Sequence, residues 1–196
     1  ILAALRRRPG LDGNADIVAL AEPGAERALP GAAAEVAWLT SRFRGVQTEL
    51  PPAHANLDGP AVIHVAAHAR LDEQRPWNSA ITLAAGEDSV VLRASDVAGR
   101  RLSVRLAVLS CCASAGGEVV GGEGVLGLAT GFLSGGAAAV MGSLWPVDDR
   151  ATARFMGDFY GTLAGGATAA EALARAQAAA RGRSATAHPF YWAGFV

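Results

Sequence analysis

The chain contains no lysine: its 17 basic residues are all arginine, against 18 acidic residues. A Walker-type phosphate loop needs a lysine, so the glycine-rich segment 121–127 is not a nucleotide site of that class. The net charge is −1, and no basic run extends beyond the three arginines at 6–8. The sequence therefore gives no electrostatic indication of binding to nucleic acid or to an anionic membrane.

Cysteine is scarce as well. The two cysteines, Cys111 and Cys112, are adjacent in the chain. A disulfide between neighbours is strained, because the bond requires Cα atoms roughly 5.5 Å apart. We therefore expect no disulfide framework, and we expect a reducing, cytoplasmic environment.

Long apolar runs are also missing. A membrane-spanning helix needs roughly 20 apolar residues, and the most apolar segment, 131–140, is shorter and rich in glycine and alanine. Hydrophobic residues still make up 51% of the 196 residues, enough for the core of one domain. We expect a single domain over 1–196, the C-terminal part of a longer protein, with residues 1–10 as the end of an upstream helix or linker.

Apolar runs and helical spacings alternate along the chain. Buried strands are predicted at 16–21, 46–50, 61–67, 105–110 and 138–144. Helices are predicted at 32–43, 96–101, 124–134, 150–163 and 168–181. The remaining expected elements are a hairpin made of 79–84 and 90–92, and an edge strand at 191–196. This alternation predicts an α/β fold, with a mostly parallel central sheet covered by helices on both faces.

Two reactive side chains follow predicted strands. In such sheets functional groups lie on loops beyond the carboxyl ends of strands, where His68 and Cys112 both occur. A free thiol has a pKa near 8.5, and a neighbouring histidine can stabilise its thiolate and later protonate a leaving amine. The backbone N–H groups of Ala69 and Cys112 are natural oxyanion donors, because both are expected outside the strand ladders.

Simpler interpretations of these residues stay open. A free cysteine at a strand end is more often a packing residue than a nucleophile. His64 and His68 have a spacing that suggests paired metal ligands, but four residues along a strand span about 13 Å. Neither a third ligand nor a dinucleotide fingerprint occurs nearby, so no metal and no cofactor are expected. The Gly-x-Ser-x-Gly motif of serine hydrolases is absent.

Five segments in order resemble one known family. They are VIHVAAH at 62–68, LSCC at 109–112, 122–125 together with 131–133, GSLWPVDD at 142–149, and HPFYW at 188–192. Together they are similar to the CHAT domain, a caspase-like cysteine peptidase domain related to caspases and separases and often found after tetratricopeptide repeats. The resemblance implies a caspase-like three-layer sandwich.

The resemblance assigns roles to individual residues. It implies that His68 and Cys112 form the catalytic dyad, that His64 is a buried structural residue, and that Cys111 fills a position for a small side chain. Ala69 stands where the family usually has glycine, which keeps the backbone donor but restricts φ. Ala113 stands where an acidic residue is common.

The motif Leu-Trp-x-Val-x-Asp lies beside the P1 pocket in the related peptidases. The resemblance thus implies that Asp149, and Asp148 with it, line a pocket that selects arginine or lysine through charge-assisted hydrogen bonds. The alternative is that one of these aspartates caps the helix predicted to start near Arg150. Both interpretations stay open at this point.

The expected function is that of a bacterial-type cysteine endopeptidase. It would cleave a protein partner, after a basic residue, under the control of an upstream tetratricopeptide or other regulatory module. The alternatives are a catalytically inactive scaffold or sensor domain of the same fold, and a nucleotide-binding α/β module. Neither nucleic acid nor a membrane is expected as a partner.

Overall fold

The computed structural model describes residues 11, 15–21, 30–48, 57, 59–72, 74–85, 88–110 and 123–196. Its centre is a five-stranded sheet whose strand order is β2-β1-β3-β7-β8. Every neighbouring pair in this sheet is parallel. The strands are β1 (Asp16–Ala21), β2 (Gly45–Gln47), β3 (Val62–Ala66), β7 (Leu106–Leu109) and β8 (Val140–Gly142).

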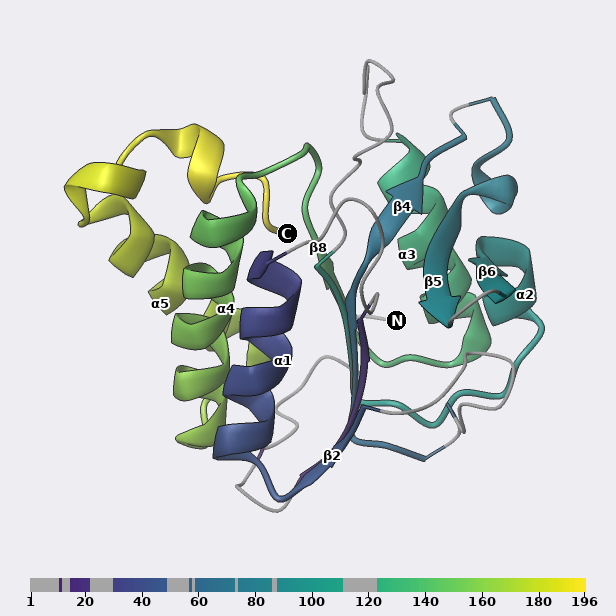
Figure 1. Cartoon of the computed structure of the whole chain (residues 1–196), viewed down its shortest axis with the longest axis horizontal. Coiled ribbons are helices and arrows are strands. Elements are labelled where there is room, and N and C mark those ends of the chain that lie inside the picture. The colour runs from purple at the N-terminus through teal and green to yellow at the C-terminus, as the bar shows by residue number, and fades with distance from the viewer. Residues whose placement is uncertain are drawn as a thin grey trace.

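Helices cover both faces of this sheet, which gives three layers (Figure 1). One face carries α1 (Pro30–Arg42), α4 (Asp149–Ala164) and α5 (Ala169–Arg181). The other carries α2 (Ala94–Ala98), α3 (Glu123–Gly135) and a small antiparallel sheet of β4 (His68–Arg70), β5 (Ala80–Ala85) and β6 (Asp88–Arg93). Three short 3-10 helices are η1 (Pro76–Asn78), η2 (Ser184–Thr186) and η3 (Pro189–Tyr191). The predicted α/β class, with a parallel sheet between helical layers, is confirmed.

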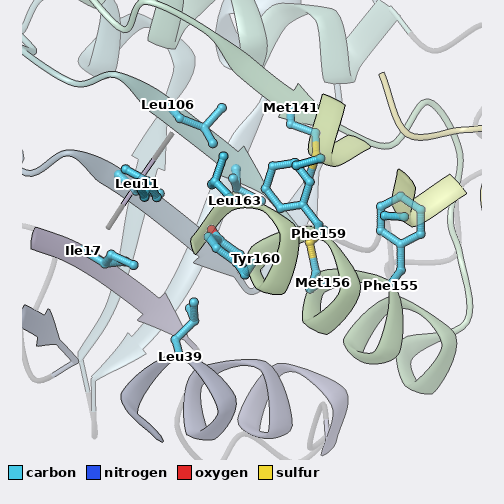
Figure 2. Close-up of a cluster of buried hydrophobic side chains, with 14 of the residues drawn as sticks. Leu11, Ile17, Leu39, Leu106, Met141, Phe155, Met156, Phe159, Tyr160 and Leu163 are labelled. Atoms are coloured by element: carbon cyan, nitrogen blue, oxygen red, sulfur yellow. The ribbon is translucent and has the colours of Figure 1, made fainter. Parts of the chain in front are cut away.

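Side chains alternate between the two faces of the central sheet, as the pleat of a strand requires. On β1, Ile17 and Ala19 join the core under α1 and α4, whereas Val18 and Leu20 join the core under α3. Both faces are buried, which explains why the strands are continuous apolar runs rather than alternating ones. Figure 2 shows the first of these cores, in which side chains of α4 pack against the sheet and Leu39 of α1.

Capping residues determine where α4 and α5 begin. The carboxylate of Asp148 accepts a hydrogen bond from the Ala151 N–H, which is a free donor of the first turn of α4. Thr168 and Glu171 form a reciprocal capping box at the start of α5. The capping alternative for the pair of aspartates is therefore confirmed for Asp148.

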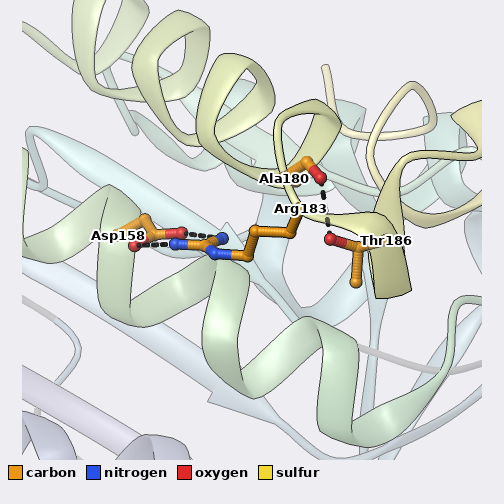
Figure 3. A network of polar contacts seen from close by, with 4 residues as sticks. All are labelled: Asp158, Ala180, Arg183 and Thr186. Carbon is orange, nitrogen blue, oxygen red and sulfur yellow. Dashed lines mark hydrogen bonds and ion pairs between the residues drawn. The ribbon is translucent and has the colours of Figure 1, made fainter.

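The C-terminal segment closes the β8 edge of the sheet. Val196 and Gly142 exchange backbone hydrogen bonds of 3.0 and 3.1 Å, and Phe195 bridges Ser143 in antiparallel orientation. The edge strand expected over 191–196 is thus limited to its last residues. Farther back in the same segment, Arg183 makes a two-pronged ion pair with Asp158 of α4 (Figure 3).

The chain after β3 differs most from the predicted elements. The strand expected at 61–67 ends at Ala66, and a second strand, β4, begins at His68. The predicted hairpin is confirmed as β5 and β6, but it belongs to the small sheet with β4. Apolar periodicity could not predict β4, because this strand has only three residues, two of them polar, and is defined by its pairing with β5. Among the described residues, none of the helices combines the length and apolarity that crossing a bilayer requires.

Candidate active site

The ends of β3 and β7 form the centre of the candidate site. These strands are parallel neighbours, and their last ladder pair joins Val65 to Leu109. His68 lies three residues beyond Val65, and Cys112 lies three residues beyond Leu109. In the sequence, the two predicted catalytic residues therefore follow adjacent strands at equal distances from the last ladder pair.

His68 is half-buried and is the first residue of β4, opposite Thr82 of β5. The expectation that it lies on a loop is wrong, because the chain pairs with the small sheet immediately after the bend at Ala67. This pairing fixes the backbone of His68 between two sheets.

Ala69 also belongs to β4, where it faces Ile81, and it is only 5% exposed. The expectation that Ala69 stands outside any strand is therefore wrong. In an antiparallel pair successive residues alternate between hydrogen-bonded and non-hydrogen-bonded positions. Strand membership alone does not show whether the Ala69 N–H points toward β5. Its role as an oxyanion donor therefore stays a prediction.

Cys111, Cys112 and Ala113 lie outside the described residues, so the dyad distance and the Cys112 oxyanion role stay predictions. The described chain before them ends at Ser110, directly after β7. The Ser110 hydroxyl is buried and has no hydrogen-bond partner among the residues that the structure describes.

The segment after β8 is tied to the C-terminus. The Ser143 hydroxyl donates to the Trp145 carbonyl at 2.7 Å, and the Trp145 indole N–H donates to the Phe190 carbonyl at 2.9 Å. Trp145 and Trp192 are half-buried and pack against the core under α4. These contacts fix the path of the chain into the first turn of α4.

Asp149 joins the starts of two helices. Its carboxylate accepts a hydrogen bond from the backbone N–H of Gly31, in the first turn of α1. A Cβ at Gly31 would collide with the carbonyl and the carboxylate of Asp149, so this close approach requires glycine. Both helices begin near the edge where the strands end (Figure 1). Asp149, the first residue of α4, therefore lies toward the end of the sheet where the strands end, while Asp148 is exposed and caps α4.

His64 is fully buried on β3, as its predicted structural role requires. Its Nδ1 shares a hydrogen bond of 3.0 Å with the Tyr160 hydroxyl, and its Nε2 lies 3.1 Å from Oε2 of Glu35. The contact between His64 and Glu35 is within ion-pair distance, but its geometry is not that of a hydrogen bond. Burial, and then the negative charge of Glu35, raise the pKa of Tyr160 well above its ordinary value.

Sequence reasoning missed Glu35 and Tyr160 as members of the buried site. One signal was available for Glu35, which stands four residues before Leu39 on the inward stripe of α1. A charged residue on such a stripe indicates a buried partner. Tyr160 gave no comparable signal, because an aromatic residue in an amphipathic helix usually belongs to the core. Within the described residues, no group of three or more histidine, cysteine or acidic side chains is arranged to hold a metal ion.

Comparisons with known proteins place the chain among its relatives. Tetratricopeptide repeat protein 28 of *Mus musculus* is 39% identical over 107 residues, and that of *Homo sapiens* is 37% identical over 107 residues. Each match covers 55% of this chain but only 4% of the relative, so the chain corresponds to a small part of those proteins. The family model of the CHAT domain matches residues 2–196. The chain therefore belongs to the CHAT domain family.

Proposed function

We propose that this CHAT domain is a cysteine endopeptidase that acts through Cys112 and His68. The observation that carries the proposal is the pairing of β3 with β7. Val65 pairs with Leu109, so β3 and β7 end side by side, about 4.8 Å apart. His68 and Cys112 each follow this pair by three residues in the sequence. Membership of a caspase-like peptidase family supports the same assignment.

The proposed reaction begins with attack of the Cys112 thiolate on the carbonyl carbon of the scissile peptide bond. The tetrahedral intermediate collapses to a thioester as the C–N bond breaks, and the His68 imidazolium protonates the leaving amine. Water, deprotonated by the now neutral His68, then hydrolyses the thioester. Backbone N–H groups of Cys112 and Ala69 are the proposed donors to the oxyanion.

Asp149 is the better of the two candidates for a basic P1 pocket. Asp148 is exposed and is committed to the cap of α4, whereas Asp149 is half-buried where α1 and α4 begin. A carboxylate has about four acceptor positions, so the bond to Gly31 leaves capacity for a guanidinium. We propose a preference for arginine or lysine at P1, selected by Asp149.

Alkylation of the full-length protein tests the proposed nucleophile. We expect iodoacetamide to label Cys112 fastest, with a pH midpoint below the ordinary cysteine value of about 8.5. Cys112→Ala should abolish this fast labelling, whereas the matched control Cys111→Ala should retain it. His68→Gln should raise the midpoint, whereas His188→Gln, at an exposed histidine, should leave it unchanged. Equal labelling rates of Cys111 and Cys112 would contradict the proposal.

Cleavage of peptides tests the P1 preference. Asp149→Asn keeps the acceptor oxygen near Gly31 but removes the charge, so cleavage after arginine should fall much more than cleavage after a neutral residue. Asp148→Asn is the matched control at the helix cap. Undiminished arginine cleavage by Asp149→Asn would remove Asp149 from the pocket.

A catalytically inactive scaffold is the second candidate function. The position of Ala69 favours it, because this buried strand residue stands where the family usually has glycine. A scaffold predicts that the Cys112→Ala protein keeps its full biological output, whereas a peptidase predicts that this output is lost.

The names of the two relatives suggest what controls the domain. Both are tetratricopeptide repeat proteins, and we propose that such a repeat module precedes the CHAT domain and regulates it by contact. Deleting the upstream module from the full-length protein should change the labelling rate of Cys112. An unchanged rate would contradict this form of control.

A further inference from the structure

A buried polar network links the middle of the central sheet to the layer of α1 and α4. His64 on β3 contacts Tyr160 of α4 at one ring nitrogen and Glu35 of α1 at the other. The residues beside His64 on the adjoining strands are Ala19 and Val108, which are both apolar. The polar partners described for the ring therefore come from the two helices.

Such a network is costly as a source of stability. The His64 and Glu35 side chains are 0% and 2% exposed, and buried ionisable groups lose hydration that their mutual attraction barely offsets. Apolar side chains of similar volume often stabilise a core equally well or better. What the polar groups add is geometry, because they favour one arrangement of the three elements over others of similar packing.

Helix α1 depends on this geometry more than its neighbours do. Its fully buried residues are Gly31, Ala32, Glu35 and Leu39. Two of these side chains are a hydrogen atom and a methyl group, so Glu35 and Leu39 are its long buried side chains, and the partly buried Val36 and Trp38 pack beside them. By contrast, α4 buries Phe155, Met156, Phe159, Tyr160 and Leu163. The position of α1 is therefore the one that the loss of a polar contact would change most.

The network and the candidate site share α1. One helical turn before Glu35, the Gly31 N–H binds the Asp149 carboxylate at the start of α4. Both helices begin at the sheet edge from which the chain continues to His68 (Figure 1). Movement of α1 relative to β3 would therefore displace the backbone donor that orients Asp149.

We propose that Glu35, His64 and Tyr160 are positioning residues that fix α1 against β3 and α4 and thereby orient Asp149 at the candidate site. This inference rests on the proposed peptidase function and on its basic P1 pocket. None of the three residues touches the substrate. Their effect reaches the site through the α1 backbone and the contact between Gly31 and Asp149.

Hydrogen exchange of the full-length protein tests the structural half of the proposal. Tyr160→Phe removes a hydroxyl from α4, yet exchange of the α1 amides should accelerate by roughly five- to tenfold relative to those of α5, the effect of losing one buried hydrogen bond. Glu35→Gln should act in the same direction. The matched control is Thr186→Val, which removes another buried hydroxyl, bonded to the Ala180 carbonyl. It should leave the exchange of α1 unchanged.

Two alkylating probes of Cys112 test the functional half. An acyloxymethyl ketone with a P1 arginine needs Asp149, whereas iodoacetamide needs only the thiolate. Tyr160→Phe should therefore slow labelling by the arginine probe roughly tenfold, equivalent to about 1.4 kcal/mol, and leave iodoacetamide labelling unchanged. A general loss of stability would instead alter the labelling rates of both probes. Thr186→Val should leave the ratio of the two rates unchanged.

The outcomes separate this inference from the proposed function. If iodoacetamide never labels Cys112 in the wild type, the peptidase proposal fails, and the positioning role fails with it even if α1 exchange confirms the network. If the wild type is labelled but both variants show wild-type exchange in α1, or an unchanged preference for the arginine probe, the positioning role is wrong. Should Tyr160→Phe fail to fold, Glu35→Gln decides the same comparison.

Discussion

The two faces of the central sheet are packed in different ways. The face under α1 and α4 is filled by large side chains, many of them aromatic, and it includes the buried polar network. Its aromatic members include Phe43, Phe155, Phe159, Tyr160 and Phe195. The face under α2 and α3 is mostly aliphatic, and there helices approach other backbone directly at glycines. These glycines are Gly127 beside Pro76, Gly131 beside Ala94, and Gly135 and Gly136 beside Val97 and Leu102.

This difference separates a layer fixed largely by backbone contacts from a layer fixed largely by side-chain contacts. Backbone in direct contact leaves no side chain that can change rotamer, so these glycines fix α3 against α2 and η1. The polar contacts described near the candidate site therefore lie on the face of α1 and α4.

The largest effect is expected from a cavity in the aromatic core under α1 and α4. Phe155 is 1% exposed and stacks on Phe195 with ring centroids 4.2 Å apart. Phe155→Ala removes this contact and leaves a cavity, so we expect the free energy of unfolding to fall by about 3–5 kcal/mol. Urea denaturation measures the change. Phe190→Ala, at a side chain that is 44% exposed, is the control and should cost much less.

On the opposite face, added atoms should instead lower the stability of the fold. A Cβ at Gly131 would lie 2.6 Å from the Ala94 carbonyl oxygen, so Gly131→Ala should destabilise the protein by about 1–3 kcal/mol through overpacking. Gly161 of α4 is the matched control, because its Cβ would meet nothing closer than 3.9 Å. There the same substitution should stabilise by about 0.5–1 kcal/mol, since alanine favours a helix. Equal effects in thermal denaturation would refute the contrast between the faces.

The polar network adds a pH dependence that the aliphatic face lacks. Because burial raises the pKa of Tyr160 in the folded state, the unfolded chain releases this proton first, near pH 10. The free energy of unfolding should therefore fall as the pH rises above about 10, by up to about 1.4 kcal/mol per pH unit. Tyr160→Phe should cost about 1–2 kcal/mol at pH 7, through the unpaired His64 nitrogen, and should flatten the alkaline decline. An unchanged slope in urea titrations between pH 9 and 11 would contradict this assignment.

The sequence predicted the elements whose cause is local. Apolar runs located β1 and β7, because a strand buried on both faces is continuously apolar. Helical spacing located α4 and α5, because burial along one stripe of a helix leaves a periodic pattern. The same reasoning placed His68 and Cys112 after strands, and the structure makes those strands neighbours. It could not find β4, since this strand of three residues, His68–Arg70, carries two polar side chains and is defined by its pairing with β5.

The apolar pattern of the sequence does not predict contacts between residues that are distant in the chain. Asp149 and Gly31 are separated by 118 residues, and His64 and Tyr160 by 96. No local preference links such pairs, so the choice between capping and a pocket stayed open for Asp148 and Asp149. The structure confirms the cap for Asp148, whereas Asp149 binds the start of α1 and its place in a pocket stays a prediction.

The smallest effect is expected at the surface of the aromatic face. Arg183 binds Asp158 through both terminal nitrogens, at 2.6 and 2.9 Å, and hydrogen bonding to Asp158 raises the pKa of Arg183 (Figure 3). The two side chains are still 33% and 27% exposed, so water and salt screen the pair. A double-mutant cycle of Arg183→Gln and Asp158→Asn should give a coupling of about 0.2–1 kcal/mol that declines in 1 M salt. A coupling as large as the Phe155 effect would mean that this ion pair, and not the aromatic packing, holds the C-terminal segment on α4.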